Sequence, residues 1–272
     1  MPATNLLTTH DLVYRFEAAG ITACVCSGEC NISEYVDEAC RQYDGVHSKF
    51  IVRGRREGWL TYSEELEKYD GNFERVQTSR DDPLLLYFTS GTTGMPKMVV
   101  HNHAYPVAHI ITARYWHNVH SDDLHLTVSE TGWMKAVWGK LYGQWFAAAS
   151  IFVYDFDKFV PHDLLHMMEK YKVTTFCAPP TIYRFFIKEG MEGYDLSALH
   201  YSTTAGEALN PEVYNRWYEF TGLRLMESYG QTETVMQVAN FVGTTPKPGS
   251  MGKPSPIYDI RLIDEDGNDI KV

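Results

Sequence analysis

The chain has 272 residues, of which 44% are hydrophobic, and its formal net charge is −11 at pH 7. This length is sufficient for one large hydrophobic core or two smaller ones. The acidic balance argues against nucleic acid or an anionic membrane as a partner, and no apolar run is long enough to span a bilayer. The residues at Met1 do not resemble a signal peptide, so we expect a soluble cytoplasmic protein.

The cysteine usage also indicates a reducing compartment, because an odd number of cysteines is spread through a large chain. The five are Cys24, Cys26, Cys30, Cys40 and Cys177. Cys24 and Cys26 lie in an apolar stretch that predicts a buried strand, where cysteine behaves as a small hydrophobic residue. A zinc site at the first four cysteines is the alternative, although their C-x-C spacing is unusual for structural zinc.

Helices and strands are expected to alternate from the N-terminus. Leu12, Val13 and Phe16 share one face of a predicted helix over residues 9–19, and Gly20 ends it. The next predicted elements are a strand at 21–26, a helix at 35–42 and a strand at 50–52. The polar and charged residues that follow, 53–82, predict a solvated connector with one short helix.

The alternation continues through the second half of the chain. The predicted strands are 124–128, 151–154, 174–177 and 223–226, and the predicted helices are 161–171, 181–188 and 211–221. The last helix has Asn210 as its expected N-cap, Pro211 at its first position and Gly222 at its end. This order predicts an α/β fold with a largely parallel sheet.

A change in composition near the end of the chain suggests a domain boundary. Residues 243–256 are rich in proline and glycine, and a new strand is predicted at 258–263, before a turn at 264–268. We therefore expect an incomplete α/β domain over 1–256 and the beginning of a β subdomain over 257–272.

A loop of small residues joins two predicted strands within YFTSGTTGMPKMVVH, residues 87–101. Between Thr89 and Lys97 the loop holds four hydroxyl side chains, two glycines and one lysine. Such a loop suits a polyphosphate, because backbone N–H groups, hydroxyls and one cation can surround the anion. It is not a Walker loop, which needs Ser or Thr after the lysine. An ordinary hairpin turn is the alternative.

Several other side chains have two interpretations. His162 and His166 have the i, i+4 spacing of a helical zinc pair, but no third ligand is evident, which favours a helix surface. Trp133 follows a probable strand-to-helix turn and is a candidate for lining a pocket. The aromatic residues at helical spacing, which we expect to pack in the core, are Trp138, Tyr142 and Trp145.

Two more loops, 202–207 and 227–234, lie at predicted strand ends. Ligands of open α/β sheets bind beyond the carboxyl ends of the strands, so these loops and the loop at 89–97 could build one site. Tyr229 offers a flat face for a base, Thr232 a hydroxyl for phosphate, and Glu233 a hard oxygen ligand for Mg²⁺.

The order of these motifs, YFTSGTTGMPKMVVH, TAGEAL, ESYGQTET and GSMGKP, resembles the adenylate-forming superfamily of acyl-CoA synthetases, peptide-synthetase adenylation domains and luciferases. The stretches SETGWMKAVWGKLYGQW and APPTIYR are most similar to the medium-chain acyl-CoA synthetases. The resemblance covers almost the whole chain. It implies that a carboxylic acid is activated with ATP to an acyl-adenylate, from which CoA accepts the acyl group.

The resemblance also implies roles for individual residues. The implied nucleotide-binding residues are Thr89, Ser90, Gly91, Thr92, Thr93, Gly94, Lys97, Gly206, Glu207, Ala208, Glu227, Ser228, Tyr229, Gly230, Gln231 and Thr232. The implied catalytic residues are Lys97, Thr232 and Glu233, and Glu233 is the implied Mg²⁺ ligand. Trp133 and Gly230 are expected to border the acyl group. The expected small molecules are ATP, Mg²⁺, CoA and a short- or medium-chain acid.

The chain is shorter than the family at both ends, and the small C-terminal domain with its lysine is not among these motifs. We therefore expect little complete synthetase activity from these residues alone, and self-association through uncovered sheet edges or apolar faces. Two other hypotheses stay open: a catalytically dead nucleotide-binding or interaction module, and part of a peptide-synthetase adenylation domain.

Overall fold

The computed structural model describes residues 1–89, 94–156 and 158–270. The chain divides into two compact units, Met1–His103 and Ala104–Val272, which are described separately here. The predicted boundary between 256 and 257 falls inside the second unit and stays a prediction.

The first unit begins with a helix whose two ends are fixed by its own sequence. The side chain of Thr8 accepts from Asp11 N–H and the carboxylate of Asp11 accepts from Thr8 N–H, so the N-terminus has a capping box. Gly20 ends the helix in the left-handed conformation. The elements of this unit are α1 (Thr9–Ala19), β1 (Ala23–Ser27), α2 (Ile32–Cys40), β2 (Ser48–Val52), β3 (Leu60–Thr61), α3 (Tyr62–Leu66), β4 (Pro83–Thr89) and β5 (Lys97–Asn102).

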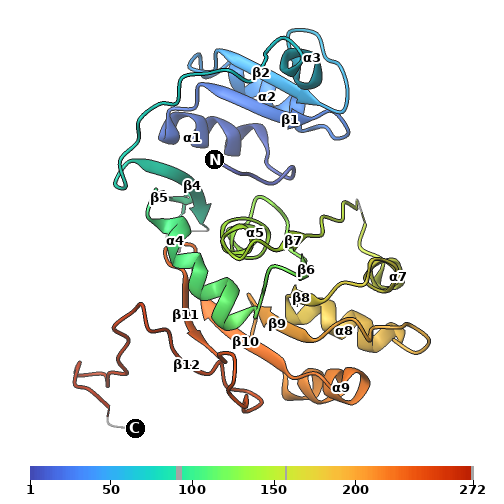
Figure 1. Ribbon diagram of the computed structural model, residues 1–272. Coiled ribbons are helices and arrows are strands. Elements are labelled where there is room, and N and C mark those ends of the chain that lie inside the picture. Colours follow the sequence, from blue (N-terminus) through green and yellow to red (C-terminus); the bar gives the residue numbers. More distant parts are fainter. Residues whose placement is uncertain (90–93, 157, 271–272) are drawn as a thin grey trace. The chain divides into compact units, whose positions relative to one another are not determined.

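Two sheets form in this unit. Strands β1, β2 and β3 make a parallel sheet in that order, and its core includes Phe16, Val36 and Ile51. Strands β4 and β5 form a separate antiparallel pair (Figure 1). The connector at 53–82 contains the one predicted short helix, α3, and the additional two-residue strand β3.

The second unit begins with a helix that changes its winding. Helix α4 (Tyr105–Ile110) continues as the π-helix η1 (Ile111–Trp116). The elements that follow are β6 (Leu124–Thr127), α5 (Lys135–Lys140), α6 (Tyr142–Phe146), β7 (Ser150–Ile151), α7 (Pro161–Tyr171), β8 (Thr175–Ala178), α8 (Pro180–Glu189), β9 (Tyr201–Ala205), α9 (Pro211–Thr221), β10 (Leu225–Gly230), β11 (Met236–Ala239) and β12 (Lys253–Pro254).

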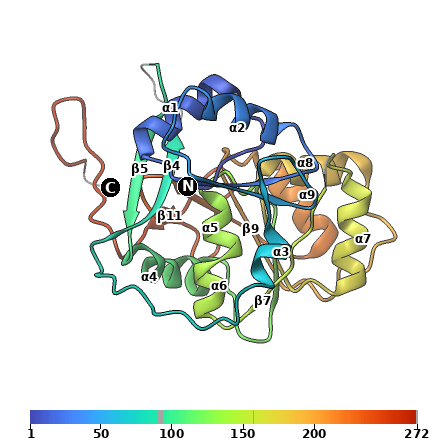
Figure 2. The same cartoon turned by 90° about the horizontal axis from the view of Figure 1, so that it is seen from above.

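A seven-stranded sheet organises this unit, in the order β12-β11-β10-β9-β8-β6-β7. The five strands from β10 to β7 are parallel, whereas β11 and β12 are antiparallel to their neighbours. Helices α7, α8 and α9 lie together beside the strands (Figures 1 and 2). The predicted α/β fold with a largely parallel sheet is confirmed.

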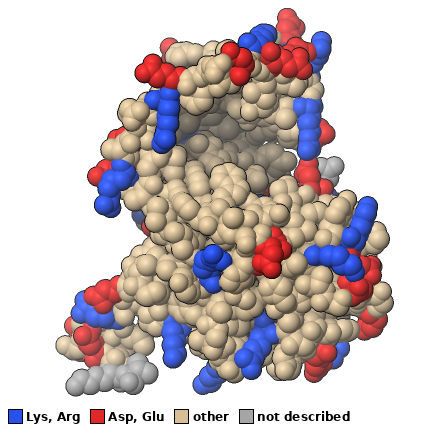
Figure 3. All heavy atoms as spheres, in the orientation of Figure 1, with Lys and Arg blue, Asp and Glu red and all other residues tan. Residues whose placement is uncertain are grey.

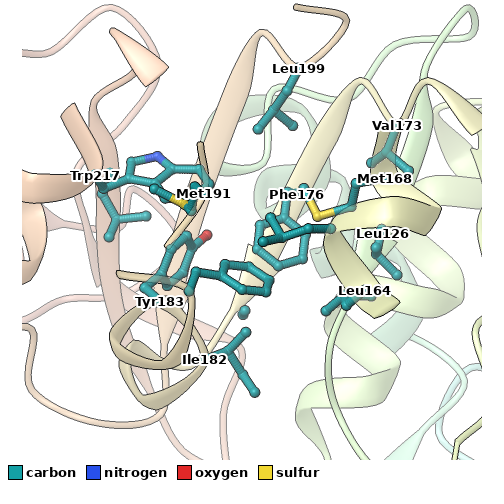
Figure 4. Close-up of a cluster of buried hydrophobic side chains, with 14 of the residues drawn as sticks. Leu126, Leu164, Met168, Val173, Phe176, Ile182, Tyr183, Met191, Leu199 and Trp217 are labelled. Carbon is teal, nitrogen blue, oxygen red and sulfur yellow. The ribbon is translucent and has the colours of Figure 1, made fainter. Parts of the chain in front are cut away.

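The two faces of this sheet are covered by different kinds of side chain. Phe176 and Leu225 point toward α7–α9, where Tyr183, Phe186 and Trp217 complete an apolar core (Figure 4). Successive side chains of a strand point to opposite faces, so the other face receives the alternate residues. That face is polar.

Histidine and threonine side chains contact one another on the polar face, although His117 Nε2 has no hydrogen-bond partner among the described residues. His117 Nδ1 lies 2.9 Å from Thr203 Oγ1, and His125 lies 2.8 Å from both Thr175 Oγ1 and Thr127 Oγ1. All five residues are buried. Since buried polar groups need partners, these contacts explain how strands rich in Ser and Thr form the centre of the sheet.

Three sequence predictions differ from the structure. Residues 258–263 form no strand and contribute only a single bridge, Ile263 to Asp269. The strand predicted at 151–154 is limited to Ser150–Ile151, although Phe152 N still donates to His125 O. Leu141, with φ −133° and ψ −105°, separates α5 from α6, so Trp138 is buried while Trp145 is exposed.

The surface carries both signs of charge. On the face drawn in Figure 3, acidic and basic side chains are interspersed around larger uncharged areas. Among the described residues, every helix is too short or too polar to cross a membrane.

Candidate functional site

The glycine-rich loop is held at its base by the β4–β5 pair. Thr89 and Lys97 face each other in the last register position of this pair. At the far side of the loop, Gly94 has φ 125°, a conformation that favours glycine, and Pro96 O accepts from Tyr14 OH at 2.8 Å. Ser90, Gly91, Thr92 and Thr93 lie outside the described residues. The predicted order of strand, loop and strand is confirmed.

The other two predicted loops begin within strands, because residues 202–205 belong to β9 and residues 227–230 belong to β10. Only the residues that follow these strands leave one edge of the large sheet. Ala178 of β8 pairs with Thr204 of β9, and Ala205 of β9 pairs with Ser228 of β10. Because these strands are parallel, the residues that follow each of them emerge at the same edge. The structure therefore brings together the segments after 178, 205 and 228.

The segment 205–209 is fixed by side chains from three neighbouring elements. Lys135 Nζ of α5 donates to Ala205 O at 2.6 Å. Glu227 Oε1 of β10 accepts from Leu209 N at 3.0 Å. Between these two anchors, Glu207 binds to α8. Gly206 itself has φ 103°, so a residue with a side chain would be strained there.

Glu207 forms a closed cluster with two residues of α8. Thr181 Oγ1 donates to the two carboxylate oxygens at 2.7 and 2.9 Å, and Arg184 Nη2 donates to the same carboxylate at 3.2 Å. Arg184 Nη2 also donates to Thr181 Oγ1 at 2.5 Å. The side chains of Arg184 and Glu207 are 52% and 43% exposed, so the cluster lies at the surface.

Lys135 is a partly buried cation that the sequence predictions missed. Burial lowers the pKa of its ammonium group, and this effect exceeds the attraction of Cys177 and Glu207. Its helix has an apolar run directly after it, Ala136, Val137 and Trp138. A single lysine before such a run is the sequence signal that could have identified it.

Glu227 supports the segment from within the protein. The residue is 4% exposed, and burial raises the pKa of its carboxyl group, partly offset by the Leu209 N–H. Its backbone oxygen accepts from Asn240 N at 2.9 Å. On the opposite face of β10, the buried hydroxyl of Ser228 has no hydrogen-bond partner among the described residues.

Tyr229 and Gly230 lie at an irregularity of the sheet edge. The pairing of β10 with β11 shifts register between these two residues. Tyr229 is 40% exposed, so one side of its ring is accessible. Gly230 packs against Trp138, and Trp138 Nε1 donates to Tyr105 OH at 3.3 Å.

Thr232 and Glu233 lie in the tight turn that follows. Gln231 N donates to Thr234 Oγ1 at 3.2 Å, and Thr234 N donates to Gln231 O at 3.1 Å. Tyr105 OH donates to Thr234 O at 3.3 Å, which ties the turn to α4. Glu233 is exposed, as a residue that binds a substrate-bound cation would be.

The other candidate groups have ordinary surroundings. Among residues 1–89, 94–156 and 158–270, no cluster of three His, Cys, Asp or Glu is arranged to hold a metal ion. His162 Nδ1 lies 3.0 Å from Tyr194 OH on the helix surface. Trp133 is 67% exposed, and its backbone N–H closes a turn with Glu130 O.

Comparisons with known proteins identify the family and the fold. The sequence profile of the family described as AMP-binding enzyme matches residues 1–272. The mouse protein named acyl-coenzyme A synthetase ACSM3, mitochondrial, is 36% identical over 98% of this chain and 46% of its own length. The rat protein named acyl-coenzyme A synthetase ACSM4, mitochondrial, is 38% identical with the same coverage.

Solved structures show the same fold. An anthranilate CoA ligase, AuaEII, in complex with anthranoyl-AMP superposes with a TM-score of 0.90 at 24% identity, over 98% of this chain and 52% of that one. An acyl-CoA synthetase from Brucella canis superposes with a TM-score of 0.87 at 23% identity, over 99% and 50%.

The chain belongs to the family of AMP-binding enzymes, among relatives that are acyl-CoA synthetases, as its motifs predicted. It spans about half the length of the curated relatives it matches. The predicted cytoplasmic location is wrong, because these relatives are named mitochondrial.

Proposed function

We propose that the chain binds ATP with Mg²⁺ and takes part in activating a short- or medium-chain carboxylic acid as an acyl-adenylate, which CoA then converts to an acyl-CoA. The observation that carries this proposal is the meeting of the segments after Ala178, Ala205 and Ser228 at one carboxyl edge of a parallel sheet. Family membership supports it.

The proposed nucleotide roles rest on the family motifs, and those at the sheet edge rest also on the geometry of that edge. Segment 206–208 borders the adenine, and the accessible face of Tyr229 stacks on it. Thr232 contacts the α-phosphate, and Lys97 with its loop surrounds the outer phosphates. Glu227 Oε1 already accepts from Leu209 N, so Glu227 supports the segment that borders the adenine rather than contacting the adenine itself.

The reaction requires positioning and neutralisation of charge rather than a protein nucleophile. A carboxylate oxygen of the acid attacks the α-phosphorus, a new P–O bond forms, and the bond to pyrophosphate breaks. Mg²⁺ held at Glu233 neutralises phosphate charge when it is bound. Trp133 and Gly230 border the acyl group.

Two measurements test the proposal. Calorimetry should detect ATP binding in the presence of Mg²⁺. ATP–pyrophosphate exchange should be weak, as expected for these residues alone, and should depend on an added acid from a series of increasing chain length. K97A should weaken ATP binding, whereas K247A, which removes an exposed lysine that has no assigned role in the site, should not.

Absence of ATP binding would contradict the proposal. Binding without exchange for any acid would favour the hypothesis of a nucleotide-binding module. The predicted self-association is a separate question, which sedimentation of the purified chain can answer.

A further inference from the structure

Segment 205–209 needs support, because it leaves the sheet through a glycine. Gly206 has φ 103°, a conformation that glycine adopts at little cost. Because glycine has no side chain, its backbone is also less restricted than that of any other residue. The segment is anchored at Ala205 by Lys135 and at Leu209 by Glu227. The residues between these points therefore depend on whatever binds the side chain of Glu207.

We propose that Thr181 and Arg184 are positioning residues for nucleotide binding, which act through the Glu207 carboxylate, and that this carboxylate does not itself contact the nucleotide. This inference rests on the proposed function. Thr181 and Arg184 hold the Glu207 carboxylate, which sets the backbone of 206–208 in the conformation that borders the base.

The direction of the hydrogen bonds supports this assignment. Arg184 can only donate, and it donates to Thr181 Oγ1 at 2.5 Å and to Glu207 Oε2 at 3.2 Å. The hydroxyl of Thr181 therefore accepts from Arg184 and turns its own proton toward the carboxylate, at 2.7 and 2.9 Å. Both carboxylate oxygens of Glu207 accept hydrogen bonds from α8. The side chain of Glu207 therefore connects the loop to the helix.

The helix that supplies these contacts is itself fixed. Ile182, Tyr183 and Phe186 of α8 are part of the apolar core, and Tyr183 OH donates to Thr203 O of β9 at 2.9 Å. Thr181 and Arg184 thus project from a rigid element toward a glycine-containing loop. A site presented from a rigid element is held more accurately than one formed by the loop alone.

Because the cluster is partly exposed, its effect on the position of the segment can be measured separately from its effect on the stability of the fold. Ion pairs between partly exposed side chains contribute little to the free energy of unfolding. Loss of Arg184 should therefore leave the thermal transition unchanged while it loosens the segment. A buried anchor such as Glu227 would not show this separation.

The test compares T181V, R184A, R184K, E207A and the double variant R184A/E207A. The matched control is R216A, which removes a similarly exposed arginine from its pair with Glu219 on α9. Hydrogen exchange at the amides of 206–209 is measured without nucleotide, and the Kd for MgATP is measured by calorimetry.

The expected result is faster exchange at these amides in T181V, R184A and E207A, with R216A like the wild type. Each of the three should weaken ATP binding roughly fivefold to tenfold, R184K should recover part of the loss, and the double variant should be no weaker than E207A. Coupled losses show that the residues act as one unit.

Additive losses in the double variant, or an E207A loss of binding with unchanged exchange, would overturn the inference, because Glu207 would then contact the nucleotide itself. Unchanged exchange in R184A would also overturn it. A wild-type chain that binds no ATP would defeat the proposed function, while the exchange data would still decide whether Thr181 and Arg184 hold the segment.

Discussion

Gly230 and Trp138 are packed so closely that no side chain fits between them. A Cβ atom built on Gly230 would lie 2.1 Å from Cη2 of the Trp138 ring and 2.8 Å from Val235 O. The tryptophan is buried and donates to Tyr105 OH, so it has little freedom to move. Glycine at this position is therefore required by the space available rather than by its dihedral angles.

The variant G230A should lower the free energy of unfolding by about 1–3 kcal/mol, the usual cost of overpacking a core. Chemical denaturation of the purified chain measures this change. The double variant W138L/G230A should lose less stability relative to W138L than G230A loses relative to the wild type. Equal losses in both backgrounds would show that the tryptophan is not the obstacle.

Replacement of Lys135 should change how stability depends on pH. Burial lowers the pKa of Lys135 in the folded chain, so the unfolded chain binds more protons between that lowered pKa and the ordinary value for lysine. Stability should therefore rise with pH through this window, and K135M should lack that rise. Denaturation curves at alkaline pH measure the slope.

K135M should also weaken MgATP binding, because Ala205 O loses its anchor. The matched control is K140M, since Lys140 is a second partly buried lysine of α5 that donates to Ser129 O instead. If both variants had the same affinity as the wild type, the anchor at Ala205 would be irrelevant to the nucleotide.

The buried histidines should make the second unit sensitive to acid. Burial lowers the pKa of His125 to about 3, and burial with the charge of His125 also lowers the pKa of His117. The unfolded chain then binds extra protons below the ordinary histidine pKa, so stability should fall as pH drops from about 6.5 toward 3, by up to about 1.4 kcal/mol per pH unit for His125. His117 should act in the same direction.

The variant H125Q should flatten this acid dependence, because glutamine does not titrate. It should be less stable at neutral pH, where the two contacts of His125 with Thr127 and Thr175 are intact in the wild type. An acid slope identical to that of the wild type would assign the dependence to other groups.

The N-cap of α9 tests whether a single capping side chain stabilises this helix. Asn210 accepts from Glu212 N at 2.8 Å, and the predicted cap is confirmed. N210A should lower the free energy of unfolding by about 1 kcal/mol, whereas N210D should be close to the wild type. Thermal denaturation of the two variants is sufficient, and a stable N210A would mean that tertiary contacts hold the helix end.

Local signals explain which elements were predictable. Helix 161–171 has the predicted limits because Pro161 can only begin a helix and the apolar residues repeat along one face. Residues 258–263 have a higher apolar content than this helix, but a strand needs a neighbouring strand, and only Ile263 pairs with another residue. Pairing is a tertiary property that no short sequence window contains.

The sequence motifs predicted the segments of the site but not the residues of other elements that hold these segments in place. Spacing placed Tyr229 and Gly206 at strand ends, and the register of β9 and β10 confirms this position. The partners of Glu207, by contrast, come from a helix more than twenty residues away, and Lys135 from a more distant one. Only the folded arrangement of elements reveals such contacts.

Helix α8 has the core on one side and the Glu207 cluster on the other, within the six residues from Thr181 to Phe186. Tyr183 and Phe186 are buried, while Thr181 and Arg184 reach the loop. A volume change at Phe186 that shifts or rotates this helix must also move both donors. Hydrophobic positions far from any ligand thus become places where laboratory evolution can tune nucleotide affinity, without a change to any residue that contacts the nucleotide.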